Sequence, residues 1–428
     1  MVRELKHMEI GDIPVDWKLQ TFDETFRVIS NNTLSRENLN NRGGAVRNIH
    51  YGDILTKFPE VLDCNEEEIP YVNELSLLSS STQLLQDGDI VVADTAEDET
   101  VGKVIEVQNL GDSKLVAGLH TIPCRVKKGD FAPGWLGYYM NSDLFHNQIL
   151  PYITGIKVSS ISKGAISETL ILVPPFDEQE KIVQSLNKIQ LLMTAETKVV
   201  NKIKLVKNGC LSKMFPQKDD TVPEMRLPGF TEAWEQRKLG ELVEIGDIDH
   251  RMPETVADGI PYLMTGDFIA TNELNFDGVK MISEEDYCQL SQKIKPEKGD
   301  ILFARYASVG AARYVDFTRE FLISYSCAII KKSRKINSKY LYHFITSNNA
   351  QRQIKLEINT GSQANIGIDS MKNNIVVSTP STEEQTKIAD VLSNLDYLIT
   401  LHQRKCDKYS NIKKGMMSDL LTGKIRLV

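Results

Sequence analysis

The sequence predicts an α/β (α+β) fold, in which two similar globular domains are separated by two long antiparallel coiled-coil helices as an internal pseudo-twofold repeat. One observation is that a single stretch occurs twice, at 174–215 and at 380–421, displaced by 206 positions without a gap. Another is that the segments before the two copies share landmark turns and apolar runs in the same order. A repeat of this period indicates that a whole structural unit is duplicated.

The two copies carry the same side chain at many equivalent positions. The matched pairs include Pro174 and Pro380, Glu178 and Glu384, Gln179 and Gln385, Leu186 and Leu392, and Lys207 and Lys413. Two unrelated amphipathic core helices are the alternative interpretation. An ungapped match of this length argues against it, because such matches rarely arise by chance.

Each copy predicts one long helix. An acidic pair follows the proline, where negative charge suits the exposed amides of a helix N-terminus. Apolar residues then alternate at spacings of four and three, which is the seam of a coiled coil. The seam residues are Ile182, Leu186, Ile189, Met193, Val200 and Ile203, and then Ile388, Leu392, Leu395, Ile399, Cys406 and Tyr409. Glu196 and His402 interrupt the seam at the same place. About 37 residues at ~1.5 Å each give a helix of roughly 55 Å.

These helices set the expected domain boundaries. Residues 1–173 form the first domain and 174–215 the central helix, while 216–379 form the second domain and 380–428 the C-terminal helix. Trp17 opens the first domain and Trp234 the second. Apolar runs at 51–55, 69–72 and 87–93 predict strands of a mixed sheet, and 298–304 repeats the last of them. The stretches 135–149 and 340–354 predict one helix each.

Composition limits the classes of function. The chain has 428 residues and a formal net charge of −8, so nucleic acid would be contacted by local patches rather than by the whole surface. No apolar run approaches the ~20 residues that span a bilayer, and the polar N-terminus is no signal peptide. Six cysteines without a CxxC pair favour reduced thiols and a cytoplasmic location.

A proline-led EQxKI helix follows each domain, the second half opens with LPGFTEAWEQRKLGEL, and one of its strands reads GDILFAR. In these features the chain resembles the specificity (S) subunit of type I restriction-modification enzymes. The resemblance implies two target-recognition domains that each read one half of a split double-stranded DNA sequence. The helices would then be a spacer that carries two adenine-N6 methyltransferase subunits, to which nuclease-translocase subunits can add.

The same resemblance implies that this chain holds no cofactor, and that S-adenosylmethionine binds the partner methyltransferase subunit. The outward faces of the helices, together with Trp17 and the connector 230–234, are expected to dock two such partners. Because the helices are near-copies, the two partners should bind in equivalent positions.

In the first domain, the segment 30–47 is rich in Asn and Arg, which can form paired hydrogen bonds with adenine and guanine. The DNA-contact candidates there are Asn31, Asn32, Arg36, Asn40, Arg42 and Arg47. A flexible, solvated loop is the alternative. The small-residue loop 155–163 adds the phosphate-contact candidates Lys157, Ser159, Ser160 and Lys163.

In the second domain, the counterpart of that loop is Gly361, Ser362, Gln363 and Asn365, and it is closer to the pattern usual in the family. Arg305, Tyr306 and Ser308 follow the GDILFA strand, where the first domain has Asp94 and Thr95 instead. The basic run with Lys331, Lys332 and Arg334 suits phosphates, although a solvated turn explains it equally well.

No catalytic or metal site is predicted. The sequence has no adenine-methylation motif and no GxxxxGK[ST] nucleotide loop. Glu196-Thr197-Lys198 matches part of a nuclease-like ExK spacing, but its position in the middle of a helix favours a surface ion pair. We therefore expect a DNA-reading scaffold. The alternatives are a coiled-coil adaptor that binds protein only and a metal-dependent nuclease with an unrecognised site.

Overall fold

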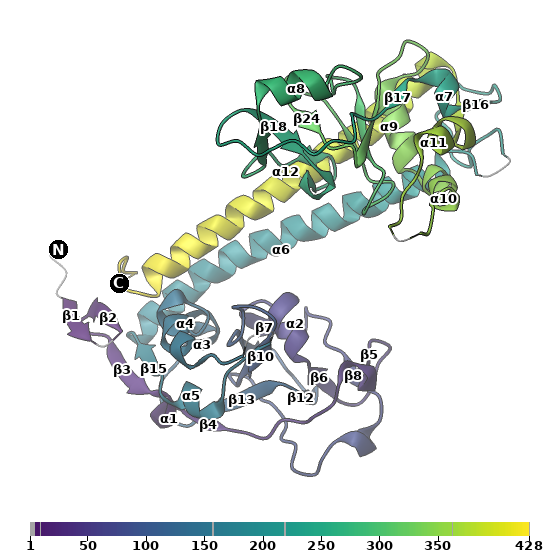
Figure 1. The fold of residues 1–428 in the computed structure, drawn as a ribbon. Helices are drawn as coiled ribbons and strands as arrows, with labels where there is room; N and C mark the ends of the chain where they lie inside the picture. Colours follow the sequence, from purple (N-terminus) through teal and green to yellow (C-terminus); the bar gives the residue numbers. More distant parts are fainter. Residues whose placement is uncertain (1–4, 9, 156–157, 218–219, 362, 428) are drawn as a thin grey trace. The chain divides into compact units, whose positions relative to one another are not determined.

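A computed structural model describes residues 5–8, 10–155, 158–217, 220–361 and 363–427. The chain divides into two compact units. Unit 1 comprises Met1–Thr194 with Asp407–Val428, and unit 2 comprises Ala195–Cys406. Helices α6 (Phe176–Lys213) and α12 (Thr382–Leu420) each contribute a segment to both units (Figure 1). The prediction of two domains linked by two long helices is therefore confirmed.

Both long helices begin just after the repeated proline. Glu178 and Gln179 donate their backbone amides to the carbonyl of Pro175, which starts the first turn of α6. Acidic residues fill the first turn of each helix, Asp177 and Glu178 in one and Glu383 and Glu384 in the other. Their charge complements the helix dipole. Gly423, with φ of 72°, lies just beyond the end of α12.

Unit 1 is built on a mixed five-stranded sheet and a second four-stranded sheet. The first has the order β4-β13-β9-β11-β7, with β11 and β7 parallel and the other pairs antiparallel; the second has the order β12-β6-β8-β5. The strands of the first are β4 (Phe26–Val28), β13 (Thr121–Val126), β9 (Ile90–Ala93), β11 (Val104–Gln108) and β7 (Val61–Asp63). Those of the second are β12 (Leu115–Ala117), β6 (Arg47–Ile49), β8 (Tyr71–Val72) and β5 (Leu39–Asn40).

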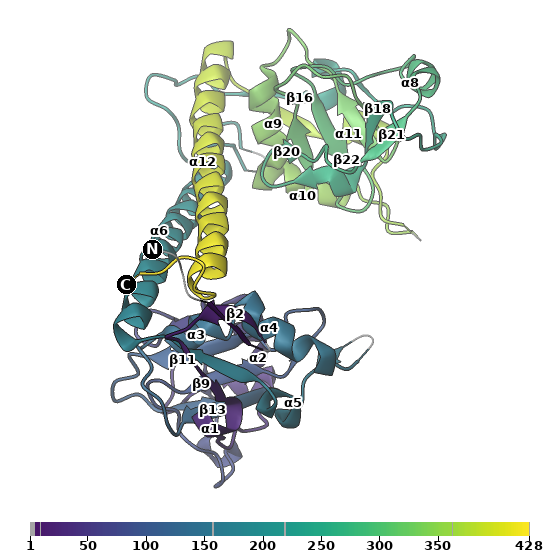
Figure 2. The same cartoon turned by 90° about the vertical axis from the view of Figure 1, so that its left-hand side faces the viewer.

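Short two-stranded pairs and helices complete unit 1, with α3 packed on β11 (Figure 2). The pairs are β1 (Leu5–Met8) with β2 (Gly11–Pro14), β3 (Lys18–Thr21) with β15 (Leu170–Val173), and β10 (Thr95–Ala96) with β14 (Ser159–Ser160). The helices are α1 (Phe22–Thr25), α2 (Tyr51–Thr56), α3 (Trp135–Tyr139), α4 (Asp143–Ile149) and α5 (Lys163–Ser167).

Two predictions for unit 1 are wrong. The stretch 51–55 is helix α2 rather than a strand, because His50 Nδ1 accepts the amide of Gly52 at 3.1 Å and caps a helical turn. The stretch 135–149 forms two helices instead of one. Ser142 accepts the Phe145 amide through Oγ and so starts α4 as a separate helix.

Unit 2 contains an antiparallel four-stranded sheet of order β17-β25-β22-β23 and a three-stranded sheet of order β21-β18-β24. The strands of the first are β17 (Ile245–Gly246), β25 (Cys327–Ile330), β22 (Ile301–Ala304) and β23 (Ala312–Tyr314). Those of the second are β21 (Lys280–Ile282), β18 (Ile260–Leu263) and β24 (Leu322–Ile323). Two further pairs are β16 (Glu235–Lys238) with β26 (Val376–Thr379) and β19 (Phe268–Ile269) with β20 (Glu273–Leu274).

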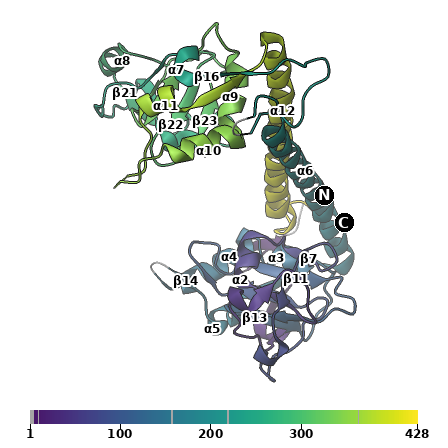
Figure 3. The same ribbon diagram turned by 90° about the vertical axis from the view of Figure 1, so that its right-hand side faces the viewer.

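The helices of unit 2 are α7 (Leu239–Leu242), α8 (Glu284–Leu290), α9 (Ser338–Thr346), α10 (Asn348–Leu356) and α11 (Ile368–Asn374). Figure 3 shows α9 beside β23, with α10 next to α9. The prediction of a single helix at 340–354 is wrong, because the helical conformation is interrupted at Ser347. That residue has extended backbone, and its Oγ accepts the Ala350 amide as the N-cap of α10.

The beginning of each long helix is buried in the core of its unit. In unit 1, Ile182 and Leu186 of α6 pack in one cluster with Trp17 and Trp135, whose rings meet edge to face at 6.3 Å. In unit 2, Ile388 and Leu392 of α12 pack with Trp234. Trp17 is 0% exposed and Trp234 is 2% exposed. The expectation that these tryptophans dock partner subunits is therefore wrong, because the core of each unit already buries them.

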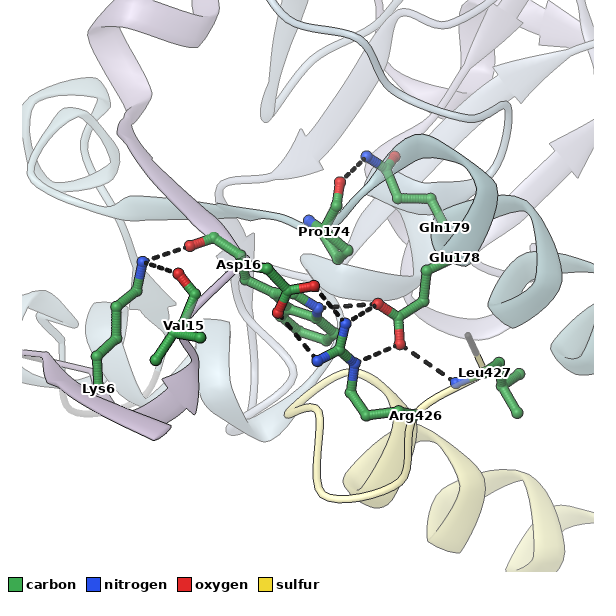
Figure 4. A network of polar contacts seen from close by, with 9 residues as sticks. Lys6, Val15, Asp16, Pro174, Glu178, Gln179, Arg426 and Leu427 are labelled. Atoms are coloured by element: carbon green, nitrogen blue, oxygen red, sulfur yellow. Dashed lines mark hydrogen bonds and ion pairs between the residues drawn. The ribbon is translucent and has the colours of Figure 1, made fainter. Parts of the chain in front are cut away.

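A shared arrangement, which we call the Trp–Glu–Arg joint, ties each helix start to its unit. In unit 1, Trp17 Nε1 donates to Glu178 at 3.0 Å, and Arg426 places two nitrogens on the same carboxylate at 2.7 Å each (Figure 4). Asp16 binds the other side of the guanidinium at 2.7 and 3.0 Å. Bonds to both carboxylates raise the pKa of Arg426 above its ordinary value.

Unit 2 repeats the joint with Trp234, Glu384 and Arg226. The indole donates to Glu384 at 3.2 Å, and Arg226 forms two bonds with that carboxylate at 2.8 Å. The glutamine next to each of these glutamates also makes the same contact in both units. Gln179 and Gln385 each donate to the carbonyl of the proline five residues earlier, at 2.9 and 2.8 Å.

A buried lysine crosses between the long helices in each unit. In unit 2, Lys207 of α6 pairs with Asp396 of α12 at 2.5 Å, and His343 of α9 lies beside that carboxylate. In unit 1, the equivalent lysine, Lys413 of α12, contacts Gln190 of α6 at 2.7 Å and forms an ion pair with Glu60. Lys413 therefore joins both helices to the globular part of unit 1, and the Lys207–Asp396 pair joins both helices beside His343 of unit 2.

His343 should make unit 2 sensitive to acid. Burial, assisted by the charge of Lys207, lowers the pKa of His343 to about 3. Since the folded pKa lies below the unfolded value of about 6.5, stability is lost as pH falls below about 6.5, reaching about 2 kcal/mol at pH 5. His343→Gln should therefore flatten the fall in melting temperature between pH 7 and pH 5, as measured by scanning calorimetry.

The matched control is His7→Gln, because the His7 side chain is 87% exposed. This variant should follow the wild-type pH profile. An unchanged profile in His343→Gln would contradict the assignment.

Candidate nucleic-acid interface

The candidate interface lies where the central strand of each main sheet ends. In unit 1, Ala93 at the end of β9 pairs with Thr121 at the start of β13, so Asp94 and His120 come together. In unit 2, Ala304 at the end of β22 pairs with Cys327 at the start of β25. We call the surroundings of these two points the strand-end edges. They bring together residues that are far apart in the sequence.

The edge of unit 1 is organised around His120. Its Nδ1 lies 3.2 Å from Thr95 Oγ1 and 3.5 Å from the carboxylate of Asp94. Its ring meets that of Tyr51 edge to face at 5.3 Å. Thr95 pairs in turn with Ser160 through the β10–β14 ladder. Strand ends, an aromatic ring and hydroxyl groups therefore share one surface.

Arg36 and His50 adjoin this edge. Arg36 forms a bidentate pair with Asp53 at 2.6 and 3.0 Å, while its side chain stays 52% exposed. The rings of His50 and Tyr51 lie 4.6 Å apart and are tilted by 31°. Burial, followed by the charge of Arg36, lowers the pKa of His50. The His50 imidazole is therefore neutral at physiological pH and can accept a hydrogen bond, which it does from Gly52.

The structure divides the other candidates of unit 1 by their exposure. Asn32 is buried and donates to Asn48 Oδ1 at 2.7 Å, and Arg47 is buried and donates to the carbonyl of Cys64 at 2.6 Å. Asn31 ties its segment to the carbonyls of Gly118 and Thr121. These three side chains hold the segment in place, so it is not a solvated loop throughout.

The remaining candidates of unit 1 reach solvent. Asn40 accepts the Arg42 amide at 2.8 Å, and this turn leaves Arg42 exposed. Ser159 and Ser160 lie half-buried in β14, and Lys163 is exposed at the start of α5. Lys157 lies outside the described residues.

The edge of unit 2 is organised around a buried ion pair between Arg305 and Asp247. Asp247 also accepts from His250 Nε2 at 2.9 Å and from Lys293 Nζ at 3.1 Å. Burial alone would raise the pKa of Asp247, but hydrogen bonds from His250 and Lys293 and the charge of Arg305 outweigh it and lower that pKa. His250 in turn stacks on Tyr325 at 4.9 Å.

Arg305 positions the neighbouring loop. It is 6% exposed, and its Nε donates to the carbonyl of Ile366 at 3.0 Å. Next to it, Tyr306 and Asn365 form a β-bridge, and Asn365 Nδ2 donates to the carbonyl of Gln363 at 3.0 Å. The ion pair therefore sets the position of an exposed loop that contains Gln363.

Other candidates of this edge are exposed. Gly361, Gln363 and Ser308 reach solvent. Ala307, which precedes Ser308, has a left-handed backbone conformation with φ of 57°. Ser362 lies outside the described residues.

The basic run of unit 2 lies at the opposite end of the sheet. Ile330, at the end of β25, pairs with Ile301, at the start of β22, so the following lysines are remote from Arg305 within the sheet. Lys331 is bound to the buried Asp300 at 2.6 Å. In unit 1, Arg125 and Asp89 make the equivalent pair, also at 2.6 Å. Lys332 and Arg334 are exposed.

Sequence reasoning missed several residues of the two edges. They are Tyr51, His120, His250, Lys293 and Tyr325. Only the polar run 247–251 gave a local signal, because it combines two aspartates with histidine and arginine. The others come from separate segments that sheet pairing brings together. Among the described residues, no group of three or more His, Cys, Asp or Glu side chains could hold a metal ion.

Comparison with known families identifies the chain. The model of the type I restriction modification DNA specificity domain matches residues 14–205 and again 231–408, which together make up most of the sequence. The chain belongs to this family. It is therefore a specificity subunit, a non-catalytic component that recognises DNA sequence within a restriction-modification complex. In the described part of the chain, no helix is long and apolar enough to cross a membrane.

Individual relatives of this specificity subunit agree. It is 24% identical over 99% of its length to the type I restriction enzyme MjaX specificity subunit of Methanocaldococcus jannaschii, covering 96% of that protein. It is 26% identical to the MjaVIII specificity subunit of the same organism, over 64% of this chain and 66% of that one.

Solved structures share its fold. The S subunit of a type I restriction-modification system from M. genitalium matches with a TM-score of 0.56 at 14% identity, over 98% of this chain and 99% of that one. A chain from a structure that describes complex assembly of the type I system matches with a TM-score of 0.53 at 14% identity, over 96% and 99%.

The two kinds of arginine at the interface should behave differently when they are removed. Arg305→Ala leaves the buried Asp247 without its closest partner and should lower the free energy of unfolding of unit 2 by about 3 kcal/mol. The exposed Arg42→Ala should change it by less than about 0.5 kcal/mol and instead weaken DNA binding. Thermal unfolding and titration with DNA measure the two effects. Equal melting temperatures in the two variants would contradict the assignment.

Proposed function

We propose that this specificity subunit reads a bipartite, asymmetric double-stranded DNA target, one half with each unit. The observation that carries the proposal is that both units share the Trp–Glu–Arg joint and the sheet framework but differ at their strand-end edges. The edge of unit 1 presents Asp94, Thr95 and His120, whereas that of unit 2 presents Tyr306, His250 and the loop with Gln363. Different side chains on equivalent frames suit two different half-sites.

In this proposal the candidates divide by chemistry. The exposed Arg42 and Gln363 and the half-buried Asn365 contact base edges, because guanidinium and amide groups can make paired hydrogen bonds there. Lys163 serves phosphates, and the buried Asn32, Arg47 and Arg305 position the segments that do the reading.

The long helices present apolar side chains for partner subunits. Equivalent positions are exposed on both helices, which supports two similar partners. The pairs are Leu191 with Tyr397, Leu192 with Leu398, and Val206 with Ile412. In unit 2, a groove of about 1050 Å³ beside α12 is lined by Tyr397, Leu401 and Phe317, among others. Exposed apolar surface of this kind marks a site of protein association.

We assign this surface to two adenine-N6 methyltransferase subunits. They bring S-adenosylmethionine, and nuclease-translocase subunits join the same complex when restriction is required. The specificity subunit itself contributes the choice of target and the separation between its halves.

Exchanging one unit should change one half of the methylated motif. Residues 216–379 would be replaced by the corresponding segment of a relative, and the hybrid co-expressed with the methyltransferase subunit. Single-molecule sequencing for N6-methyladenine should then show a split motif with one new half and one unchanged half. An intact complex that methylates no split motif would refute DNA reading and leave the protein-only adaptor.

Lengthening both long helices should widen the gap alone. Seven residues inserted after Lys198 and after Arg404 keep the seam in phase and add about 10 Å to each helix, or about three base pairs. The same sequencing should find both half-sites unchanged with a wider gap. A changed half-site, or an unchanged gap, would show that the helices do not set the spacing.

A further inference from the structure

The two residues that interrupt the helix seam contact each other. Glu196 of α6 and His402 of α12 are 206 positions apart, so they occupy the same place in the repeat. The Glu196 carboxylate nevertheless accepts a hydrogen bond from His402 Nδ1. Lys405 Nζ approaches the other carboxylate oxygen at 3.4 Å. Both side chains of the central pair are largely buried, with 17% of Glu196 and 20% of His402 exposed.

Only the centre of an antiparallel pair of repeated helices allows such a contact. Away from the centre, a residue of one helix contacts a residue that is not its repeat equivalent. Lys207, for example, contacts Asp396, whereas its repeat equivalent is Lys413. At the centre, each helix presents the same repeat position to its partner. The side chains at that position therefore distinguish pairing of α6 with α12 from pairing of either helix with its own copy.

This distinction matters because α6 and α12 present nearly the same seam. A helix could accordingly pair with the identical helix of a second chain. Pairing of α6 with α6 would set Glu196 against Glu196, and the equivalent of Lys405 would be the uncharged Val199. Pairing of α12 with α12 would crowd two copies of His402 and Lys405. Only pairing of α6 with α12 sets the carboxylate against the basic groups.

We propose that Glu196, His402 and Lys405 form a pairing code that directs α6 to the α12 helix of its own chain and disfavours assembly with a second copy. The code works by opposing charges at one position and by repulsion in both self-pairings. It does not depend on DNA reading. It also accounts for Glu196 in the ExK-like triplet, because both carboxylate oxygens are engaged by α12.

Two complementary full-length variants test the code. Variant X carries Glu196→Lys, and variant Y carries His402→Glu with Lys405→Glu. Within either chain the central charges repel, but α6 of X complements α12 of Y, and α6 of Y complements α12 of X. The two chains would be co-expressed with different affinity tags, and mixed species measured by sequential purification and light scattering. X with Y should give at least about tenfold more mixed species than two wild-type chains, a change equivalent to about 1.4 kcal/mol.

A third variant combines all three substitutions in one chain and restores opposite charges. It should match wild type in melting temperature and in having little mixed species, which separates lost pairing from simple misfolding. The matched control is Lys202→Glu co-expressed with Lys408→Glu, because these exposed residues occupy equivalent repeat positions. The control pair should behave as wild type. If X and Y mix no more than wild type, or if the combined variant is not restored, the pairing code is refuted.

Discussion

One carboxylate at the start of each long helix holds the helix, the globular core and a third segment together. Glu178 and Glu384 each accept an indole N–H and two guanidinium nitrogens, and each is almost fully buried. Such a carboxylate is stable only with these partners, since an isolated buried charge is costly. Moving the helix would break all three bonds at once. The orientation of each helix within its unit therefore depends on this residue.

The buried lysines extend the constraint along the helices. Lys207 and Lys413 are almost fully buried, and each finds polar partners on the other helix of the pair. A slip of one helical turn would leave an almost fully buried ammonium without its partner. A buried polar contact of this kind specifies register at some cost in stability. Joint and lysine together fix both the beginning and the register of the helix pair in each unit.

The sequence predicted the parts of the fold that repeat and missed those that form by distant pairing. The long helices, and the equivalence of Glu178 with Glu384, follow from a repeat that is visible without any structure. Arg426 could not be matched to Arg226 in this way, because the two arginines follow their long helices, α12 and α6, at different distances along the sequence. Helix α2 was missed for two reasons. Its N-cap is a histidine, which is not a usual capping residue, and the apolar pair Ile54 and Leu55 near Gly52 is equally typical of a short strand.

The candidate site shows the same limit. An arginine directly after a strand suggested a DNA contact, yet Arg305 is buried because Asp247, far away in the sequence, lies next to it. Residue type gave the chemistry, while sheet pairing decided which groups reach solvent. Lys331 is a similar case, because its charge is taken up by Asp300.

The two ends of each main sheet consequently have different tasks. One end carries an equivalent ion pair in both units, Asp89 with Arg125 and Asp300 with Lys331. In unit 2, Asn337, a few residues beyond that end, donates its amide to Gln385 in the first turn of α12. The other end, where β9 and β22 stop, carries different side chains in the two units. Because strands of the sheet separate the two ends, side chains at the strand-end edges can differ without disturbing the joint, and a common frame can present two unlike reading surfaces.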